Sequence, residues 1–320
     1  MTENQIKKYI LKNDRIMAEI TNAGAAIVSL QVCDRDGKKR DVVLGYDDLT
    51  KYTSNTVYFG AILGRMAGEI RPACFEWNGK MIDLPKDENG RHLHGGADGI
   101  SFKVWNTECA NEKKLRFFVL SSEEESGYPQ DVVFSAEYTL DDNALCLEYS
   151  ASAAVPTPVN MTVHPYFNLN GHEDGDVSGH VLCINADEYS VTWGDELAKG
   201  TVFSCADNAL LDFRKAKEIG DHEYDLNYVL NGKHEYVAEL FSVQSGIRMR
   251  MKCSAPCIQC YNACETNEIG KGGAVYGKGS AICLEPQHFP NNVNIPWAET
   301  PTAYGKNGYK HTVRYEFDLK

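Results

Sequence analysis

The 320-residue sequence predicts an all-β fold, most economically one large antiparallel β-sandwich. Segments that alternate apolar and polar residues, or carry runs of β-branched and aromatic residues, recur along the chain, as in 15–21, 114–120 and 144–149. Turn dipeptides separate such segments from end to end, and helical patterns are few. Strands linked by tight turns favour hairpins and meanders rather than crossover connections.

The turn signals are Asp36-Gly37, Asn78-Gly79, Asn89-Gly90, Asn170-Gly171 and Asn231-Gly232. Helical periodicity with caps is limited to short pieces at 47–52 and 206–211, so a doubly wound α/β fold is not expected. No Pro/Gly/Ser linker, change of composition or fixed-period repeat divides the chain. We therefore expect a single domain over residues 1–320.

The charge balance argues against two classes of partner. The chain carries 45 acidic and 32 basic residues, a net charge of −13, so its average surface repels phosphate backbones and anionic lipid. Nucleic acid and membrane surfaces are therefore not expected as partners. A neutral small molecule is compatible with this charge, and the chain is expected to be a monomer or a homodimer.

Targeting signals and cysteine usage both point to the cytoplasm. The N-terminal region has only a short apolar run at 9–11 and no small-residue cleavage site, and no stretch reaches the ~18 apolar residues of a membrane span. Eleven cysteines with scattered spacing are typical of reduced thiols rather than of a disulfide framework.

Three histidine-containing segments and one acidic residue could carry chemistry: 91–96 with His92 and His94, 160–168 with His164, and 284–290 with Glu285. Taken alone, each histidine is better explained as a loop residue bonded to backbone. His92 and His94 could form half of a metal site, because alternate residues of a strand share a face. No partner ligands lie nearby in sequence, and Gly95-Gly96 favours a chain reversal at a ligand, with His94 touching a sugar as the alternative.

Two further motifs partly match cofactor-binding sites, but neither has the pattern that such a site needs. Cys253, Cys257, Cys260 and Cys264 could hold zinc or an iron–sulfur cluster, but 258–261 is predicted to be a strand, where residues three apart face opposite sides. The glycine-rich run 272–279 nearly matches a phosphate-binding loop but has glycine where a Ser or Thr must hold magnesium. We interpret it as a flexible loop that leads into the strand carrying Glu285. No metal or organic cofactor is expected.

Taken together and in order, the segments resemble the aldose 1-epimerase (galactose mutarotase) family over nearly the whole chain. The resemblance runs through 20–30, 41–46, 58–65, the segment around His94, and 157–160. Its most specific parts are 164–169, which reads His-x-Tyr-Phe-Asn-Leu, and 284–290, which reads Leu-Glu-x-Gln-His-Phe-Pro.

The resemblance implies a β-sandwich of the galactose-mutarotase type that interconverts the α and β anomers of a free hexose or pentose, without metal or cofactor. It implies that His164 protonates the ring oxygen and that Glu285 removes the proton from the C1 hydroxyl. His94, Asp225 and Gln259 match positions that contact the sugar.

This chemistry needs one proton added and one removed, which explains the residue types. A carboxylate with a pKa of ~4.3 is ionised at neutral pH, whereas an imidazole with a pKa of ~6.5 is mostly neutral. We therefore predict that nearby carboxylate charge raises the pKa of His164.

The sequence departs from the family pattern beside the expected site. Where the family has Asn-Arg, this chain has Gly68-Glu69, and Arg71 is expected to share a strand face with Glu69 and partly to replace the missing guanidinium. Val163 and Leu226 also replace the polar residues that the family commonly has beside His164 and Asp225. These changes leave the preferred sugar open. Several scattered Lys and Arg residues also leave a sugar phosphate open as the substrate.

Two alternatives remain open. A carbohydrate-cleaving enzyme on a similar sandwich could use Asp225 and Glu285 as its two carboxylates. A non-catalytic sugar-binding or regulatory protein could have kept the scaffold, which the departures at Gly68 and Glu69 suggest. Retention of both His164 and Glu285 favours the isomerase.

Overall fold

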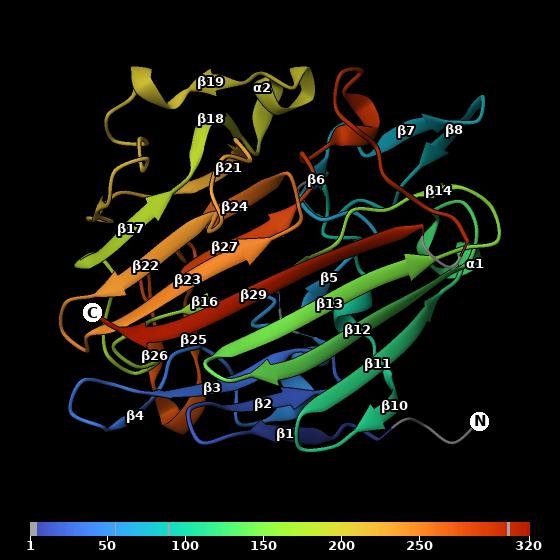
Figure 1. Cartoon of the computed structure of the whole chain (residues 1–320). Helices are drawn as coiled ribbons and strands as arrows, with labels where there is room; N and C mark the ends of the chain where they lie inside the picture. Colours follow the sequence, from blue (N-terminus) through green and yellow to red (C-terminus); the bar gives the residue numbers. More distant parts are fainter. Residues whose placement is uncertain (1–4, 55, 89, 306–307) are drawn as a thin grey trace.

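The computed structural model describes residues 5–54, 56–88, 90–305 and 308–320. Within them the chain folds mainly into antiparallel strands, so the predicted all-β class is confirmed (Figure 1). The N-terminal part forms a four-stranded sheet in sequence order. Its strands are β1 (Lys8–Lys12), β2 (Met17–Thr21), β3 (Ile27–Cys33) and β4 (Lys39–Asp41).

The largest sheet has nine strands in the order β10-β11-β12-β13-β29-β23-β22-β17-β20. They are β10 (Asn106–Ala110), β11 (Lys114–Ser121), β12 (Val132–Asp141), β13 (Ala144–Ser152), β29 (Tyr309–Leu319), β23 (Ile247–Cys253), β22 (Ala238–Ser242), β17 (His180–Ile184) and β20 (Lys217–Glu218). The long C-terminal strand β29 lies between β13 and β23 and so joins the two halves of the sheet (Figure 1).

A six-stranded sheet, ordered β16-β27-β24-β21-β18-β19, packs against the nine-stranded sheet. Its strands are β16 (Tyr166–Phe167), β27 (Ile282–Gln287), β24 (Cys257–Tyr261), β21 (Asp225–Leu230), β18 (Ala186–Val191) and β19 (Phe203–Ser204). The predicted strands at 258–261 and through Glu285 are β24 and β27.

Five two-stranded ladders and a few short helices complete the described part of the chain. The ladders pair β5 (Ile62–Leu63) with β15 (Thr162–Val163), β6 (Glu69–Ile70) with β9 (His92–Leu93), β7 (Cys74–Trp77) with β8 (Lys80–Asp83), β14 (Thr157–Pro158) with β28 (Thr302–Ala303), and β25 (Glu268–Ile269) with β26 (Val275–Tyr276). The helices are α1 (Glu123–Ser126), α2 (Gly194–Lys199), η1 (Leu49–Thr53), η2 (Ile100–Phe102), η3 (Cys205–Asp207), η4 (Lys271–Gly273) and η5 (Asn292–Asn294), where η marks a 3₁₀ helix.

The predicted helical pieces are both single 3₁₀ turns, η1 and η3, while α1 and α2 were not anticipated. The turn at Asn78-Gly79 is confirmed: both residues have positive φ and link β7 to β8 as a two-residue hairpin loop. Asn89 of the Asn89-Gly90 signal lies outside the described residues. In the part of the chain described, no helix is long and apolar enough to cross a membrane.

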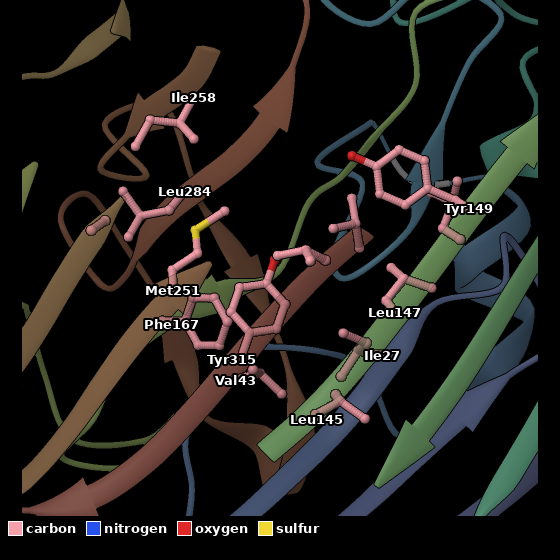
Figure 2. Close-up of a cluster of buried hydrophobic side chains, with 14 of the residues drawn as sticks. Ile27, Val43, Leu145, Leu147, Tyr149, Phe167, Met251, Ile258, Leu284 and Tyr315 are labelled. Carbon is pink, nitrogen blue, oxygen red and sulfur yellow. The ribbon is translucent and has the colours of Figure 1, made fainter. Parts of the chain in front are cut away.

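The main core lies between the two large sheets. Leu145, Leu147, Met251 and Tyr315 of the nine-stranded sheet meet Ile258, Leu284 and Phe167 of the six-stranded sheet, and Ile27 and Val43 close one end (Figure 2). These side chains are almost fully buried. Because strand side chains alternate, the residues next to Ile258 and Leu284 must point out of the other face of the six-stranded sheet.

Candidate active site

The face of the six-stranded sheet turned away from the main core carries three of the predicted site residues. On β24 and β27, Ile258 and Leu284 point into the core, so Gln259 and Glu285 point to the opposite face. On β21, Leu226 is in the core and Asp225 is not. Alternation along three neighbouring strands therefore gathers an acid, an amide and a second acid on one surface.

Glu285 lies at the buried end of this surface. Its side chain is 2% exposed, and its strand position is directly opposite Gln259. No described residue bonds to Glu285 Oε2 or to Gln259 Oε1, although both atoms are buried. Burial, followed by the negative charge of Asp225, raises the pKa of Glu285 well above its ordinary value. Two buried acceptors without partners are unusual in a folded chain and mark a place built for a polar ligand.

His164 reaches Glu285 from a different direction. It lies between β15 and β16, and its backbone is fixed by hydrogen bonds to the chain at Gly60 and Ala61. Its ring stacks on Tyr166 with the centroids 4.9 Å apart. Nε2 of His164 lies 3.5 Å from Oε1 of Glu285, so two residues 121 positions apart in sequence meet in one buried space.

The predicted pKa shift of His164 is wrong in direction. Burial lowers the pKa of His164 to about 3 rather than the carboxylate raising it. The imidazole loses its hydration among aromatic rings, and this loss favours its neutral form. Burial also drives the neighbouring carboxyl group of Glu285 toward its neutral form.

His94 stands beside His164, with ring centroids 5.8 Å apart. Its Nδ1 accepts a hydrogen bond from the backbone N–H of Gly68 at 3.1 Å. Burial, and next the nearby His164, hold the pKa of His94 well below its usual range, so the ring is neutral. A neutral imidazole that accepts at Nδ1 carries its proton on Nε2. His94 therefore presents an N–H donor.

The expectation that His92 and His94 share a strand face is wrong. His94 has φ +52°, in the left-handed region, which ends β9 and turns its ring away from that of His92. His92 is buried elsewhere, with Nδ1 2.8 Å from the carbonyl oxygen of Pro85 and Nε2 2.7 Å from the hydroxyl of Tyr128. The two rings serve different sites.

Asp225 lies at the open end of the surface and is exposed. Its carboxylate accepts from the amide nitrogen of Gln259. Surrounding protein atoms raise the pKa of Asp225 despite its exposure, and the bond from Gln259 opposes the shift. Gln259 thus joins the exposed acid to the strand position opposite Glu285.

Glu69 and Arg71 lie near Gly68, which bonds to His94. Glu69 is buried, and its Oε1 is 3.2 Å from Nη1 of Arg71, whose side chain is 44% exposed. Asn291 anchors Arg71 by bonding to both its backbone N–H and its carbonyl oxygen. Glu69, which stands where the family has arginine, therefore pairs with Arg71, the residue expected to replace the missing guanidinium.

Val163 and Leu226 do not line the site. Both pack into the main core, because neighbours in a strand point to opposite faces. The apolar residues at these two positions therefore affect the core and not the surface near His164 and Asp225. These two departures carry no information about the preferred sugar.

Tyr58 was not anticipated. It has φ +56°, and its ring contacts those of His94 at 5.0 Å and His164 at 6.3 Å between centroids. His164 is thus held between Tyr166 on one side and Tyr58 on the other. A tyrosine in the left-handed region is a local strain that surrounding structure must hold, and such strain gathers at functional sites.

The cysteine and glycine motifs are accounted for by packing. Cys260 is in the main core, while Cys257 packs with Phe289 and Ile295 on the other face of β24, so the predicted opposite placement is confirmed. Among the residues the structure describes, no three His, Cys, Asp or Glu side chains gather as metal ligands. The glycine-rich run begins at a fixed point, because Lys271 is buried and donates to Val28 O, Val43 O and Asp41.

Comparisons with known proteins identify the family of the chain. A family model described as aldose 1-epimerase matches residues 7–316. Galactose mutarotase of Mus musculus is 34% identical over 327 residues, which cover 98% of this chain and 94% of that protein. Aldose 1-epimerase of Escherichia coli (strain K12) is 28% identical over 326 residues, covering 95% of this chain and 93% of that protein.

Solved structures show the same fold. A crystal structure of an aldose epimerase homologue from C. elegans superposes with a TM-score of 0.93 at 24% identity and covers 98% of this chain and 99% of that chain. A galactose 1-epimerase from Lactobacillus acidophilus gives a TM-score of 0.80 at 23% identity, with 98% of each chain covered. The predicted sandwich of the galactose-mutarotase type is confirmed, and the chain belongs to the aldose 1-epimerase family of isomerases.

Proposed function

We propose that this chain interconverts the α and β anomers of a free aldose, with His164 as general acid and Glu285 as general base. One observation carries the assignment: Nε2 of His164 and Oε1 of Glu285 lie 3.5 Å apart in one buried space. The reaction exchanges protons at two oxygens bonded to the same carbon, the ring oxygen and the C1 hydroxyl. An acid and a base this close to each other can reach both.

The steps follow from those positions. Glu285 takes the proton of the C1 hydroxyl, the bond between C1 and the ring oxygen breaks, and His164 gives a proton to that oxygen. The aldehyde turns about the bond between C1 and C2, and the reverse transfers close the ring on its other face. Each positioned group contributes typically ~10²–10⁴-fold to such a rate. The chemistry needs neither a metal nor an organic cofactor.

The proton inventory of the pair fits this scheme. Burial favours neutral His164 and protonated Glu285, which together hold one transferable proton. The imidazolium–carboxylate form holds the same single proton. Hydrogen bonds from the sugar hydroxyls stabilise the charged form, so the bound substrate shifts the pair toward imidazolium and carboxylate, the forms that act as acid and base.

Four further residues are proposed to hold the sugar. His94 supplies an N–H donor, Gln259 Oε1 supplies an acceptor, and Asp225 and Arg71 supply charged groups at the open end. Charged partners make stronger hydrogen bonds to hydroxyls than neutral ones do, which favours correct orientation of C1 over the pair. The relatives named galactose mutarotase make D-galactose the first substrate to test.

Neither alternative is favoured. The relatives are named for epimerisation rather than cleavage, and Gln259 stands on the strand between those of Asp225 and Glu285, where a hydrolase would need both carboxyls around one bond. A cytoplasmic location is proposed on the eleven unpaired cysteines. The net charge of −13 supports the absence of nucleic-acid partners. A monomer or a homodimer is proposed as the assembly.

Polarimetry on freshly dissolved α-D-galactose, α-D-glucose, L-arabinose and D-xylose tests the proposal. We expect the protein to accelerate the approach to anomeric equilibrium for at least one of them. Incubation with disaccharides should release no new reducing ends. Failure to accelerate any of the four sugars would favour a binding protein instead.

A further inference from the structure

Two arginines adjoin one short ladder next to the site: Arg71 directly follows β6, and Arg91 directly precedes β9. In the β6–β9 ladder, Glu69 is opposite Leu93 and Ile70 is opposite His92. One step further along the two chains brings Arg71 opposite Arg91. His94 follows at the other end of β9, where it meets Gly68 and His164. The ladder thus ends in two guanidinium groups on one side and a site histidine on the other.

The other arginine of this region points elsewhere. Arg65 is buried, and its guanidinium donates to the hydroxyl and carbonyl oxygen of Ser121 and to the carbonyl oxygen of Pro129. It therefore serves the packing of the chain. At position 69, where the resemblance implies a sugar-binding guanidinium, this chain has a buried carboxylate paired with Arg71.

Arg91 is held in a fixed place by a short loop. Its backbone N–H donates to Asp87 Oδ1 at 2.8 Å, its Nε lies 3.2 Å from Asp87 Oδ2, and its carbonyl oxygen accepts from the backbone N–H of Asp87 at 2.7 Å. The side chain remains 40% exposed. An arginine oriented through its Nε loses less freedom when its fork binds hydroxyl groups.

The positive charge of Arg91 acts on groups of the site that come from three separate segments. Surrounding protein atoms raise the pKa of both Tyr58 and Asp225, and the charge of Arg91 opposes each rise. Burial and His164 lower the pKa of His94, and Arg91 adds to that effect. Tyr58, His94 and Asp225 share no strand, so the guanidinium of Arg91 lies within electrostatic range of groups from three separate segments of the site.

We propose that Arg91 is a specificity-determining residue that donates hydrogen bonds to hydroxyl groups of the aldose distant from C1. Together with Arg71, it supplies the hydrogen-bond donors that the carboxylate of Glu69 cannot supply. The two arginines are each paired with a carboxylate, Glu69 and Asp87, and Asp225 adds a further negative charge. Because these carboxylates offset the positive charge of the two arginines, this part of the site selects a neutral aldose over a sugar phosphate. This inference rests on the proposed function.

The experiment compares kcat and KM for D-galactose in the wild-type protein and in Arg91→Ala. Loss of a hydrogen bond from a charged donor should raise KM about tenfold or more and leave kcat within about twofold. Arg91→Lys should recover only part of the loss, because it keeps the charge without the fork. Arg116→Ala is the matched control, since Arg116 is 43% exposed and its Nε is 3.0 Å from Glu108.

Calorimetric binding of 1-deoxy-D-galactose, which lacks the C1 hydroxyl and cannot mutarotate, separates the two claims. Arg91→Ala should weaken its Kd by a similar factor, while Arg116→Ala should leave it unchanged. Equal Kd values for the wild type and Arg91→Ala would overturn the role of Arg91 alone. Binding of this sugar without acceleration of any aldose would overturn the proposed function. Turnover of galactose 6-phosphate as efficient as that of galactose would overturn the selection of neutral sugars.

Discussion

Gln259 on β24 is paired directly opposite Glu285 on β27, and its amide nitrogen donates to the carboxylate of Asp225. The amide oxygen of Gln259 and Oε2 of Glu285 have no partner among the described residues. Gln259 therefore bonds to the exposed acid and lies on the strand next to the one that carries the buried acid. The negative charge of Asp225 is the second cause, after burial, of the raised pKa of Glu285.

Replacing Glu285 by Gln should remove activity and stabilise the fold. Turnover should fall by about 10²–10⁴-fold, because one proton-transfer group is lost. The pKa of Glu285 in the folded chain is above the ordinary 4.5, so the wild-type free energy of unfolding decreases as pH rises from 4.5 toward the folded pKa. The gain in melting temperature of Glu285→Gln should therefore be larger at pH 8 than at pH 4.

The matched control for this variant is Glu148→Gln. Glu148, on β13 of the nine-stranded sheet, is 43% exposed and pairs with Lys310 on β29. Its replacement should therefore change the free energy of unfolding by no more than about 0.5 kcal/mol at either pH. A wild-type melting temperature equal to or above that of Glu285→Gln at pH 8 would show that burial of this carboxyl group is not costly.

The alkaline limit of kcat/KM should move when Asp225 is replaced by Asn. The pair is active while it holds one proton, and it loses that proton as pH rises through the raised pKa of Glu285. Asp225 is one cause of the raised pKa, so its neutral analogue should shift the alkaline limb to lower pH. Asp195→Asn, on the exposed side of α2, should leave the limb in place. A limb that moves to higher pH would contradict the coupling.

The acid side of the same profile tests the correction at His164. With a pKa near 3, this imidazole gains a second proton only far below pH 6.5. We expect kcat/KM to stay level between pH 7 and pH 5 in the wild-type protein. A threefold or greater fall across that interval would mean that the free enzyme contains an imidazole with an ordinary pKa.

The buried ion pair of Lys271 and Asp41 should matter for stability and not for chemistry. Lys271 Nζ lies 2.6 Å from Asp41 Oδ2, and the lysine side chain is 8% exposed. Lys271→Met should lower the free energy of unfolding by about 3 kcal/mol, because a partly buried carboxylate loses its partner. Asp41→Asn in the same chain should recover part of the loss, which chemical denaturation can measure.

Lys278→Met is the control for that pair, because Lys278 and Glu223 are both 61% exposed. Exposed pairs contribute at most about 1 kcal/mol. A loss in Lys278→Met as large as that in Lys271→Met would show that burial does not distinguish the two pairs.

The strands could be predicted from the sequence because their signals are local, whereas the roles of the site residues follow only from the resemblance to the family. Alternation along 258–261 determines which side of β24 Gln259 occupies, and a strand through Glu285 follows from the same pattern. Helices α1 and α2 span four and six residues, too few to repeat a helical period, so they were missed. Glu69 and Arg71 lie close together as expected, because only Ile70 separates them in one short segment.

Features that depend on three-dimensional surroundings were not predictable in this way. The left-handed φ of His94 cannot be inferred from its neighbours, and this φ turns the ring of His94 away from that of His92. The depressed pKa of His164 depends on Tyr166, Tyr58 and the burial that they create. Tyr58 itself comes from a segment without any catalytic motif. A positive φ at a tyrosine is visible only in the structure.

The most direct test of the paired roles is a double-mutant cycle measured by polarimetry on D-galactose or on whichever sugar the wild type prefers. His164→Asn and Glu285→Gln should each reduce the catalysed rate by orders of magnitude. If the two groups act together across 3.5 Å, the double variant should be no slower than the slower single variant. Rate losses that multiply in the double variant, or near-native activity in either single variant, would contradict the account.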